Sequence, residues 1–268
     1  MAMLIAADNL SAARPSVRRL MAARDAEGLA ALVGRLAAAG ADWIDLNPGY
    51  LPARERAEVW RFLINAAEAA CDRILMLDAP TAADLDLALG FCSRPPVLNM
   101  ATAEDGRLGP VLDIAAAHGL AVVAATMTAR VPADADGRLA LAALIVDEAK
   151  KREIVGERLI LDPMVMPLAL PGGEAQAAAV LACLRALPCL FDPAPLSLVA
   201  LSNLTTATAA ARAAFAGPAY LAAACGAGLG VAMLDVTDAA LMRAARLCAV
   251  FEGRRIFAPA EHQGEKPA

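Results

Sequence analysis

The sequence predicts an α/β protein, a (β/α)8 TIM barrel, on the strength of three observations. Short apolar segments alternate with Ala-rich helical segments along most of the 268 residues, and such alternation is typical of a parallel sheet with right-handed crossovers. The alternation repeats eight times, which in a chain of this length indicates a closed barrel. The first loop, AADNLSAAR (residues 6–14), lacks the GxGxxG turn expected of an open, doubly wound sheet that binds a dinucleotide.

The eight predicted strands are short apolar runs, and the Leu-Ile-Leu run at 159–161 is typical of a strand buried on both faces. The strands span residues 4–8, 43–47, 73–78, 96–99, 121–127, 158–162, 197–203 and 231–235. Each is followed by a predicted helix rich in Ala, the residue with the highest helix propensity. The helices span residues 25–39, 53–70, 82–89, 107–118, 134–151, 174–187, 207–224 and 238–250. No linker interrupts this order, so residues 1–258 are predicted to form a single domain, and the polar residues 259–268 a disordered tail.

Composition and charge exclude several classes of function. The longest apolar stretch, residues 219–234, contains three glycines and ends at Asp235, so it is too short and too interrupted to span a membrane. The start of the chain lacks the basic segment of a signal peptide. The net charge is −5 and the largest basic cluster is KKR at 150–152, which does not indicate a nucleic-acid surface. With two histidines and no CxxC pair, a His-based metal site or a Ser-His triad is not expected. We expect a cytoplasmic protein that binds neither membrane nor nucleic acid.

Asp and Asn dominate the predicted carboxyl ends of the strands. One of them, Asp162, directly follows a buried run, where a carboxylate is unfavourable unless it is paired or hydrogen-bonded. Any single Asp or Asn here can simply cap the next helix or make a turn. Because active sites of barrels form at the carboxyl ends of the strands, we expect the whole set to share one rim. The set comprises Asp8, Asn9, Asp45, Asn47, Asp78, Asn99, Thr126, Thr128, Asp162, Asn203 and Asp235.

A rim of this composition favours a flat heterocycle over a metal ion. An Asp carboxylate accepts two parallel N–H bonds from a 2-amino-pyrimidinone edge, while an Asn offers one donor and one acceptor. Pterins present such an edge. Carboxylates without His make a poor transition-metal site, although a few of them can bind Mg²⁺.

Five motifs in the same order and spacing resemble the pterin-binding methyltransferases. They are AGADWIDLNPG (39–49), MLDAPT (76–81), LNMATAE (98–104), LILDPMVMPL (159–168) and LSNLT (201–205). Within this family the chain is most similar to the methyltetrahydrofolate:corrinoid protein methyltransferases. The folate module of cobalamin-dependent methionine synthase and dihydropteroate synthase are more distant.

The resemblance implies a (β/α)8 barrel, usually a homodimer, which transfers the N5-methyl group of methyltetrahydrofolate to cob(I)alamin carried by a separate corrinoid protein. It assigns the pterin ring to Asp78, Asn99 and Asp162, and it assigns the contact with N5, and so the catalytic role, to Asn203. Asp45 and Asn47 match the second-strand motif and are expected to help bind the pterin. Since a tertiary amine is a poor leaving group, N5 must be protonated or strongly hydrogen-bonded as the methyl group departs.

The chain departs from the family pattern in three places. The first strand ends ADNLS (7–11) instead of Gly-Glu-Arg-Ile-Asn, Ala79 and Thr81 replace the usual Ser and Asn after the third strand, and GPAY (217–220) replaces an Asn-Arg pair before an aromatic residue. The first and third changes remove charge that would meet a folate tail, so a related tetrahydropterin is an alternative substrate. A repurposed, non-catalytic pterin-binding barrel is an alternative function, and an Mg²⁺-dependent lyase using Asp45, Asp78 and Asp162 is a third.

Overall fold

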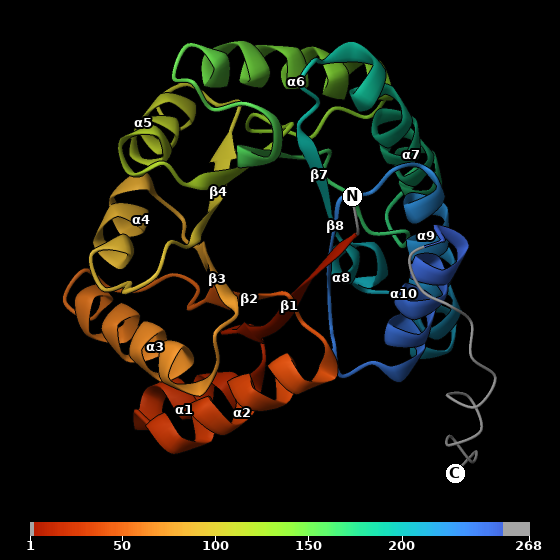
Figure 1. Ribbon diagram of the computed structural model, residues 1–268. Helices are drawn as coiled ribbons and strands as arrows, with labels where there is room; N and C mark the ends of the chain where they lie inside the picture. The colour runs from red at the N-terminus through yellow and green to blue at the C-terminus, as the bar shows by residue number, and fades with distance from the viewer. Residues whose placement is uncertain (1–2, 254–268) are drawn as a thin grey trace.

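The structure, a computed structural model, describes residues 3–253 and, within them, every side chain except those of residues 210–213. Eight parallel strands pair in the order of the sequence and close into a barrel through the contact of the last strand with the first (Figure 1). They are β1 (Leu4–Ser11), β2 (Trp43–Asn47), β3 (Ile74–Asp78), β4 (Val97–Thr102), β5 (Ala121–Ala125), β6 (Leu159–Asp162), β7 (Leu196–Ala200) and β8 (Val231–Leu234). The predicted (β/α)8 barrel is confirmed. The tail predicted at 259–268 lies outside the described residues, and the single domain predicted for 1–258 stays a prediction.

Helices surround the barrel on its outer side, except α8 (Leu201–Thr205), which lies inside this ring beside β8 (Figure 1). The helices are α1 (Pro15–Ala23), α2 (Ala26–Ala39), α3 (Arg56–Ala70), α4 (Ala82–Leu89), α5 (Leu108–His118), α6 (Ala135–Lys150), α7 (Gly173–Leu190), α8 (Leu201–Thr205), α9 (Ala210–Gly226) and α10 (Ala239–Phe251), with a 3₁₀ turn at Gly156–Arg158. Two of these helices, α1 and α8, were not predicted. Helix α1 begins at Pro15, a residue that suits the first helical position because its missing N–H needs no partner there.

Helix α8 corrects the predicted strand at 197–203. The strand ends at Ala200, and the LSNLT segment that follows is one helical turn. Leu201 and Leu204 are both buried while Ser202 between them is exposed, and a spacing of three residues places the two leucines on one helical face. Asn203 therefore belongs to a helix that follows the strand and not to the strand itself.

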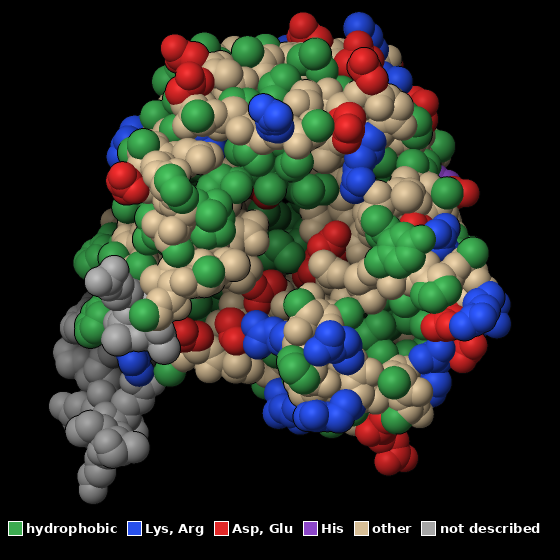
Figure 2. All heavy atoms as spheres, turned by 180° about the vertical axis from the view of Figure 1, so that it is seen from behind, with side chains coloured by type: hydrophobic (Ala, Val, Ile, Leu, Met, Phe, Trp, Pro, Cys, Tyr) green, Lys and Arg blue, Asp and Glu red, His purple; other side chains and the backbone are tan. Residues whose placement is uncertain are grey.

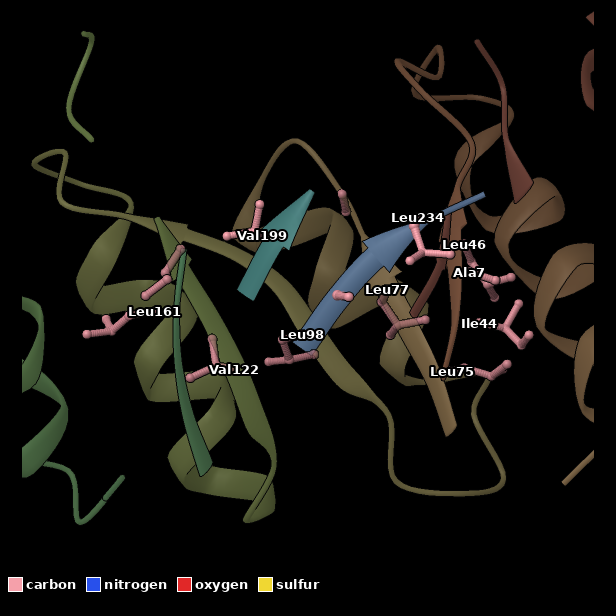
Figure 3. Close-up of a cluster of buried hydrophobic side chains, with 14 of the residues drawn as sticks. Ala7, Ile44, Leu46, Leu75, Leu77, Leu98, Val122, Leu161, Val199 and Leu234 are labelled. Carbon is pink, nitrogen blue, oxygen red and sulfur yellow. The ribbon is translucent and has the colours of Figure 1, made fainter. Parts of the chain in front are cut away.

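The strands carry two apolar layers because their side chains alternate between opposite faces. One set packs outward against the helices, as Ile44, Leu77, Leu98 and Leu161 do in Figure 3. The other set fills the barrel interior and comprises Ala6, Trp43, Met76, Val97, Val123, Ile160, Leu198, Ala200, Val231 and Met233. The inner set is a packed plug, so any ligand site must lie above it, at an open end of the barrel.

Among the helices of residues 3–253, α7 is long and apolar enough to cross a membrane by length and composition, with 39% of it buried inside the protein. Its buried side chains include Val180, Leu184 and Leu187, which belong to the main core cluster. We therefore assign α7 to the helical layer around the barrel, where an apolar face is required for packing.

Candidate functional site

A cavity of about 380 Å³ opens at the carboxyl ends of the strands, and all six residues predicted to bind the ligand line it. Figure 2 shows a hollow at the centre of this face, with acidic side chains inside it. The six residues are Asp45, Asn47, Asp78, Asn99, Asp162 and Asn203. The cavity is completed by Asp8, Ser11, Ala13, Arg14, Met100, Met164, Leu198, Ala200, Ser202, Thr206 and Met233.

The alternation of the strands explains why these polar side chains converge. Ile160 points into the barrel and Leu161 points out, so Asp162, two residues after Ile160, points inward again. The same spacing of two relates Met76 to Asp78 and Val97 to Asn99. On these strands, the inward-pointing residue inside the barrel is apolar, and the next inward-pointing residue, two positions closer to the open end, is polar.

Asp78 is held by Asn47 from the neighbouring strand. The Asn47 Nδ2 donates to Asp78 Oδ2 at 2.6 Å, and Asn47 Oδ1 in turn accepts from the Gly49 backbone N–H at 2.9 Å. Burial raises the pKa of Asp78 to about 6, against the opposing effects of the Asn47 hydrogen bond and the Arg107 charge. Asn47 therefore orients a carboxyl group that ionises near neutral pH.

Asp45 lies deepest of the acidic residues and is 1% exposed. Its Oδ1 accepts a long hydrogen bond from Asn99 Nδ2 at 3.4 Å. Burial, and then the negative charge of Asp78, raise the pKa of Asp45 well above its ordinary value. Protonation of Asp45 is thus easier than that of an exposed Asp, and its side chain contacts the Asn99 amide, which the resemblance assigns to the ligand.

The carboxyl group of Asp162 is fixed by the turn that follows β6. Its Oδ1 accepts from the Met164 backbone N–H at 2.7 Å, and among the described residues no hydrogen bond reaches Oδ2. Met164 holds this turn with a positive φ of 58°. Burial raises the pKa of Asp162 to about 7, although the Met164 hydrogen bond and the Arg138 charge act in the opposite direction.

Arg138 of α6 supports the same turn and was missed by the sequence analysis. Its Nε donates to the Pro163 carbonyl at 2.8 Å, and its Nη2 donates to the Met164 carbonyl at 3.4 Å and to Gln176 Oε1 at 3.1 Å. The residue is fully buried. One signal was available, because Arg138 lies on the same helical face as the buried Ala142 and Ile145, where a charge needs a partner.

Arg14 was also missed, and it brings a positive charge to the first loop. The residue directly precedes α1, its Nη1 lies 2.9 Å from Asp235 Oδ2, and its Nη2 lies 3.2 Å from Asp8 Oδ1. The loop that was expected to have lost its charge therefore still places a guanidinium at the cavity. Burial would raise the pKa of Asp235, but hydrogen bonds from Thr237, Asn9 and Arg14 outweigh it and lower the pKa to about 2.

Of the other strand-end residues, Asp8 lines the main cavity, whereas Asn9, Thr126, Thr128 and Asp235 do not. Asn9 donates to Asp235 Oδ1 at 2.5 Å and accepts from the Val236 backbone N–H, so it links β1 to β8. Thr126 is buried with no hydrogen-bond partner for its hydroxyl. Within residues 3–253, no group of three or more His, Cys, Asp or Glu residues is arranged to hold a metal ion.

Comparison with curated proteins finds a sequence relative, although no family model matches the chain. Over 169 residues the chain is 26% identical to a methylcorrinoid:tetrahydrofolate methyltransferase of Eubacterium limosum. The match covers 62% of this chain and 62% of that protein. The chain therefore matches somewhat less than two thirds of the length of its curated relative.

Comparison with solved structures finds the same barrel in dihydropteroate synthases. A Yersinia pestis DHPS with a pterine-sulfa conjugate matches with a TM-score of 0.68 and 16% identity, covering 95% of this chain and 94% of that one. The dihydropteroate synthase of Xanthomonas albilineans, in complex with 7,8-dihydropteroate, matches with a TM-score of 0.66 and 18% identity over 94% of both chains. At this identity the solved structures show the fold alone. Together with the sequence relative they confirm the resemblance to pterin-binding barrels.

Proposed function

We propose that this chain, which is similar in sequence to a methylcorrinoid:tetrahydrofolate methyltransferase and shares the barrel of the dihydropteroate synthases, is itself a methyltransferase. It would move the N5-methyl group between methyltetrahydrofolate, or a related tetrahydropterin, and the cob(I)alamin of a corrinoid protein. The observation that carries the proposal is the convergence of the six residues assigned from the motifs on one cavity. The protein would act in the cytoplasm, as a homodimer.

The pterin ring would lie with its amino-pyrimidinone edge toward Asp78, Asn99 and Asp162. Asp162 Oδ2 has no hydrogen bond within the described part of the chain, and the second oxygen of Asp78 is free of the Asn47 contact. Both carboxyl groups thus have acceptor capacity for the ring N–H groups. Asn99 offers one donor and one acceptor to the same edge, and its amide is steadied by Asp45. The two methionines at the cavity wall, Met100 and Met164, would pack against the flat ring.

In this reaction the protein does not have to supply a nucleophile. Accordingly, no Cys or His is among the described residues that line the cavity. The corrinoid would supply the nucleophile, a Co(I) centre that accepts the methyl group. The bond between N5 and the methyl carbon breaks, its electron pair stays on N5, and N5 takes up a proton. The role of Asn203, half-buried at the cavity wall, would be a hydrogen bond to N5 that strengthens as this charge develops.

The test is the formation of methylcobalamin, followed by its absorbance, from methyltetrahydrofolate and cobalamin reduced with titanium(III) under anaerobic conditions. We expect formation that depends on the protein. The control variant is Arg18→Ala, which changes an exposed residue of α1 outside the cavity and should behave as the unmodified protein. Absence of transfer to both free and protein-bound cobalamin would contradict the proposal.

A non-catalytic pterin-binding barrel is the second candidate. It is favoured by the altered first loop, where Arg14 is already engaged by two carboxylates and cannot replace the missing family residue without breaking an ion pair. This candidate predicts that methyltetrahydrofolate binds, as measured by calorimetry, while no methyl group is transferred in either direction.

A further inference from the structure

A second hollow, of about 410 Å³, adjoins the candidate pterin cavity. We call it the outer hollow. Arg14, Ser202 and Thr206 line both, so the two spaces meet at these side chains. The outer hollow is completed by residues of α8, α9, the segment after β8 and α10, namely Leu201, Thr205, Ala214, Gly217, Asp235, Asp238 and Leu241.

The barrel order places the outer hollow where a substituent of the ring would emerge. In the proposed function, the amino-pyrimidinone edge lies against residues of β3, β4 and β6. Since the strands close in sequence order, the opposite side of the cavity is formed by β8 and β1. The side chain of a pterin is attached at the end of the ring system remote from the amino-pyrimidinone edge, so it must leave on that side, past Arg14.

The charges on this side are unfavourable for an anionic side chain. Asp235 and Asp238 line the outer hollow, Asp8 lies next to it, and Arg14 is the one cation among the described lining residues of the two spaces. Arg14 is already shared between Asp8 and Asp235, so the three groups together keep a net charge of −1 when both carboxyls are ionised. The pKa of Asp235, about 2, keeps that residue ionised at neutral pH.

Among the described side chains, the remaining polar groups of the lining are hydroxyls. Ser202, Thr205 and Thr206 contribute three hydroxyls, and Leu201, Ala214, Gly217 and Leu241 contribute apolar surface. At Gly217 an added Cβ would lie 3.2 Å from Leu241 Cδ2, so α9 and α10 approach each other closely here. The Thr205 and Thr206 hydroxyls already donate to the Ser202 carbonyl, so the lining offers mainly acceptors, and these suit an uncharged side chain that carries a hydroxyl donor.

From this lining we propose that the outer hollow selects tetrahydropterins whose side chain is uncharged and hydroxyl-bearing or small, and that its carboxylates disfavour the anionic p-aminobenzoylglutamate tail of folate. The inference rests on the proposed function, because it takes the ring position from it. It concerns the substrate class and leaves the reaction unchanged. Two of the three departures from the family pattern, ADNLS (7–11) and GPAY (217–220), contribute residues to the lining of these two spaces.

The first test compares two ligands on the protein by calorimetry: methyltetrahydrofolate and the tail-free 5,6-dimethyl-5,6,7,8-tetrahydropterin, which keeps the N5-methyl group. We expect the tail-free ligand to bind as tightly as methyltetrahydrofolate within threefold, or more tightly. If methyltetrahydrofolate bound more than threefold more tightly than the tail-free pterin, the inference would be overturned. If neither ligand binds, the proposed function itself fails, and this outcome is distinct from a failure of the selectivity alone.

The second test removes one charge and leaves the fold intact. Asp238 caps α10 by accepting from the Ala240 and Leu241 backbone N–H groups, and Asn is an equally good cap, so Asp238→Asn should fold normally. We expect methyltetrahydrofolate to bind this variant about threefold more tightly, with no change for the tail-free pterin. The matched control is Asp136→Asn, a change in the first turn of α6 outside both spaces. Unchanged folate affinity in Asp238→Asn, or an equal gain for both ligands, would contradict the selectivity.

Discussion

Asn47 and Asp78 come from neighbouring strands and are joined by a hydrogen bond of 2.6 Å between Asn47 Nδ2 and Asp78 Oδ2. The Asn47 side chain is itself fixed by the Gly49 backbone N–H. The bond leaves the other oxygen of Asp78 available in the cavity and opposes the rise of its pKa. Asn47 would thus affect ligand binding indirectly, by orienting the carboxyl group of Asp78.

Asn47→Ala is predicted to weaken tetrahydropterin binding by about tenfold, roughly the value of one hydrogen bond to a charged group. Removing the amide frees Asp78 to rotate and raises its pKa above about 6. Calorimetric titration at pH 6.5 and pH 8.5 checks this, because the loss should be smaller at pH 8.5, where Asp78 is ionised in both proteins. An equal loss at both values would mean that Asn47 acts on the ligand directly.

The affinity for the pterin should fall as the pH is lowered from 8 to 5. Burial raises the pKa of Asp162 to about 7 and that of Asp78 to about 6, so both carboxyls take up protons over this range and lose acceptor capacity for the ring N–H groups. Dissociation constants of the tail-free pterin across this range check the prediction. Asp162→Asn should remove the step near pH 7, and a wild-type affinity that does not change with pH would contradict the assignment.

The carboxyl group of Asp162 should reduce the stability of the folded protein at high pH. The folded-state pKa of Asp162 lies above that of an unfolded Asp, so its favourable contribution is fully present below about pH 4 and is lost as the pH rises through about 7. Asp162→Asn is therefore predicted to be more stable than the unmodified protein at pH 8, by about 1–3 kcal/mol, and not at pH 4. Urea unfolding at the two pH values measures the difference. A variant that is less stable at pH 8 would show that the Met164 contact outweighs the burial of charge.

Arg138→Ala should both destabilise the protein and weaken ligand binding. The change leaves the carbonyls of Pro163 and Met164 without their partner and opens space in a fully buried position, at a cost of about 3 kcal/mol. Because the turn carrying Asp162 loses its support, the pterin affinity should fall at temperatures where the variant is still folded. Arg130→Ala, at an exposed loop position, is the matched control and should change neither quantity.

Asn203→Ala is predicted to slow methyl transfer by about 10²-fold while it weakens pterin binding by less than tenfold. The reason is that its hydrogen bond to N5 would strengthen only as the methyl group leaves. Single-turnover rates at saturating pterin separate the two effects. A loss of binding as large as the loss of rate would assign Asn203 to ring binding alone.

Much of the fold and of the cavity was predictable because both follow from local patterns. The alternation of apolar strands with Ala-rich helices indicates the barrel, and an Asp or Asn two residues after an inward apolar residue, as with Ile160 and Asp162, is directed to the open end. Residues 201–203 were assigned to the same strand as β7, and the packing of Leu201 and Leu204 on the core decides in favour of a helix.

The supporting residues were not predictable in the same way. Arg138 and Asp162 are 24 positions apart and belong to different elements, so nothing local connects the guanidinium to the turn after β6. Arg14 and Asp235 are 221 positions apart in the sequence, and they come into contact only because the barrel closes between β8 and β1. Its one sequence signal is its place directly before Pro15, which marks the start of a helix at the mouth of the barrel.

The position of a bound tetrahydropterin tests the central proposal most directly. A crystal structure of the protein grown near pH 8 with the tail-free tetrahydropterin should show the amino-pyrimidinone edge within hydrogen-bond distance, about 3 Å, of Asp162, Asn99 and Asp78. N5 should face Asn203, and the side chain should point past Arg14. A ring bound elsewhere, or with its amino-pyrimidinone edge toward Arg14 and Asp235, would contradict it.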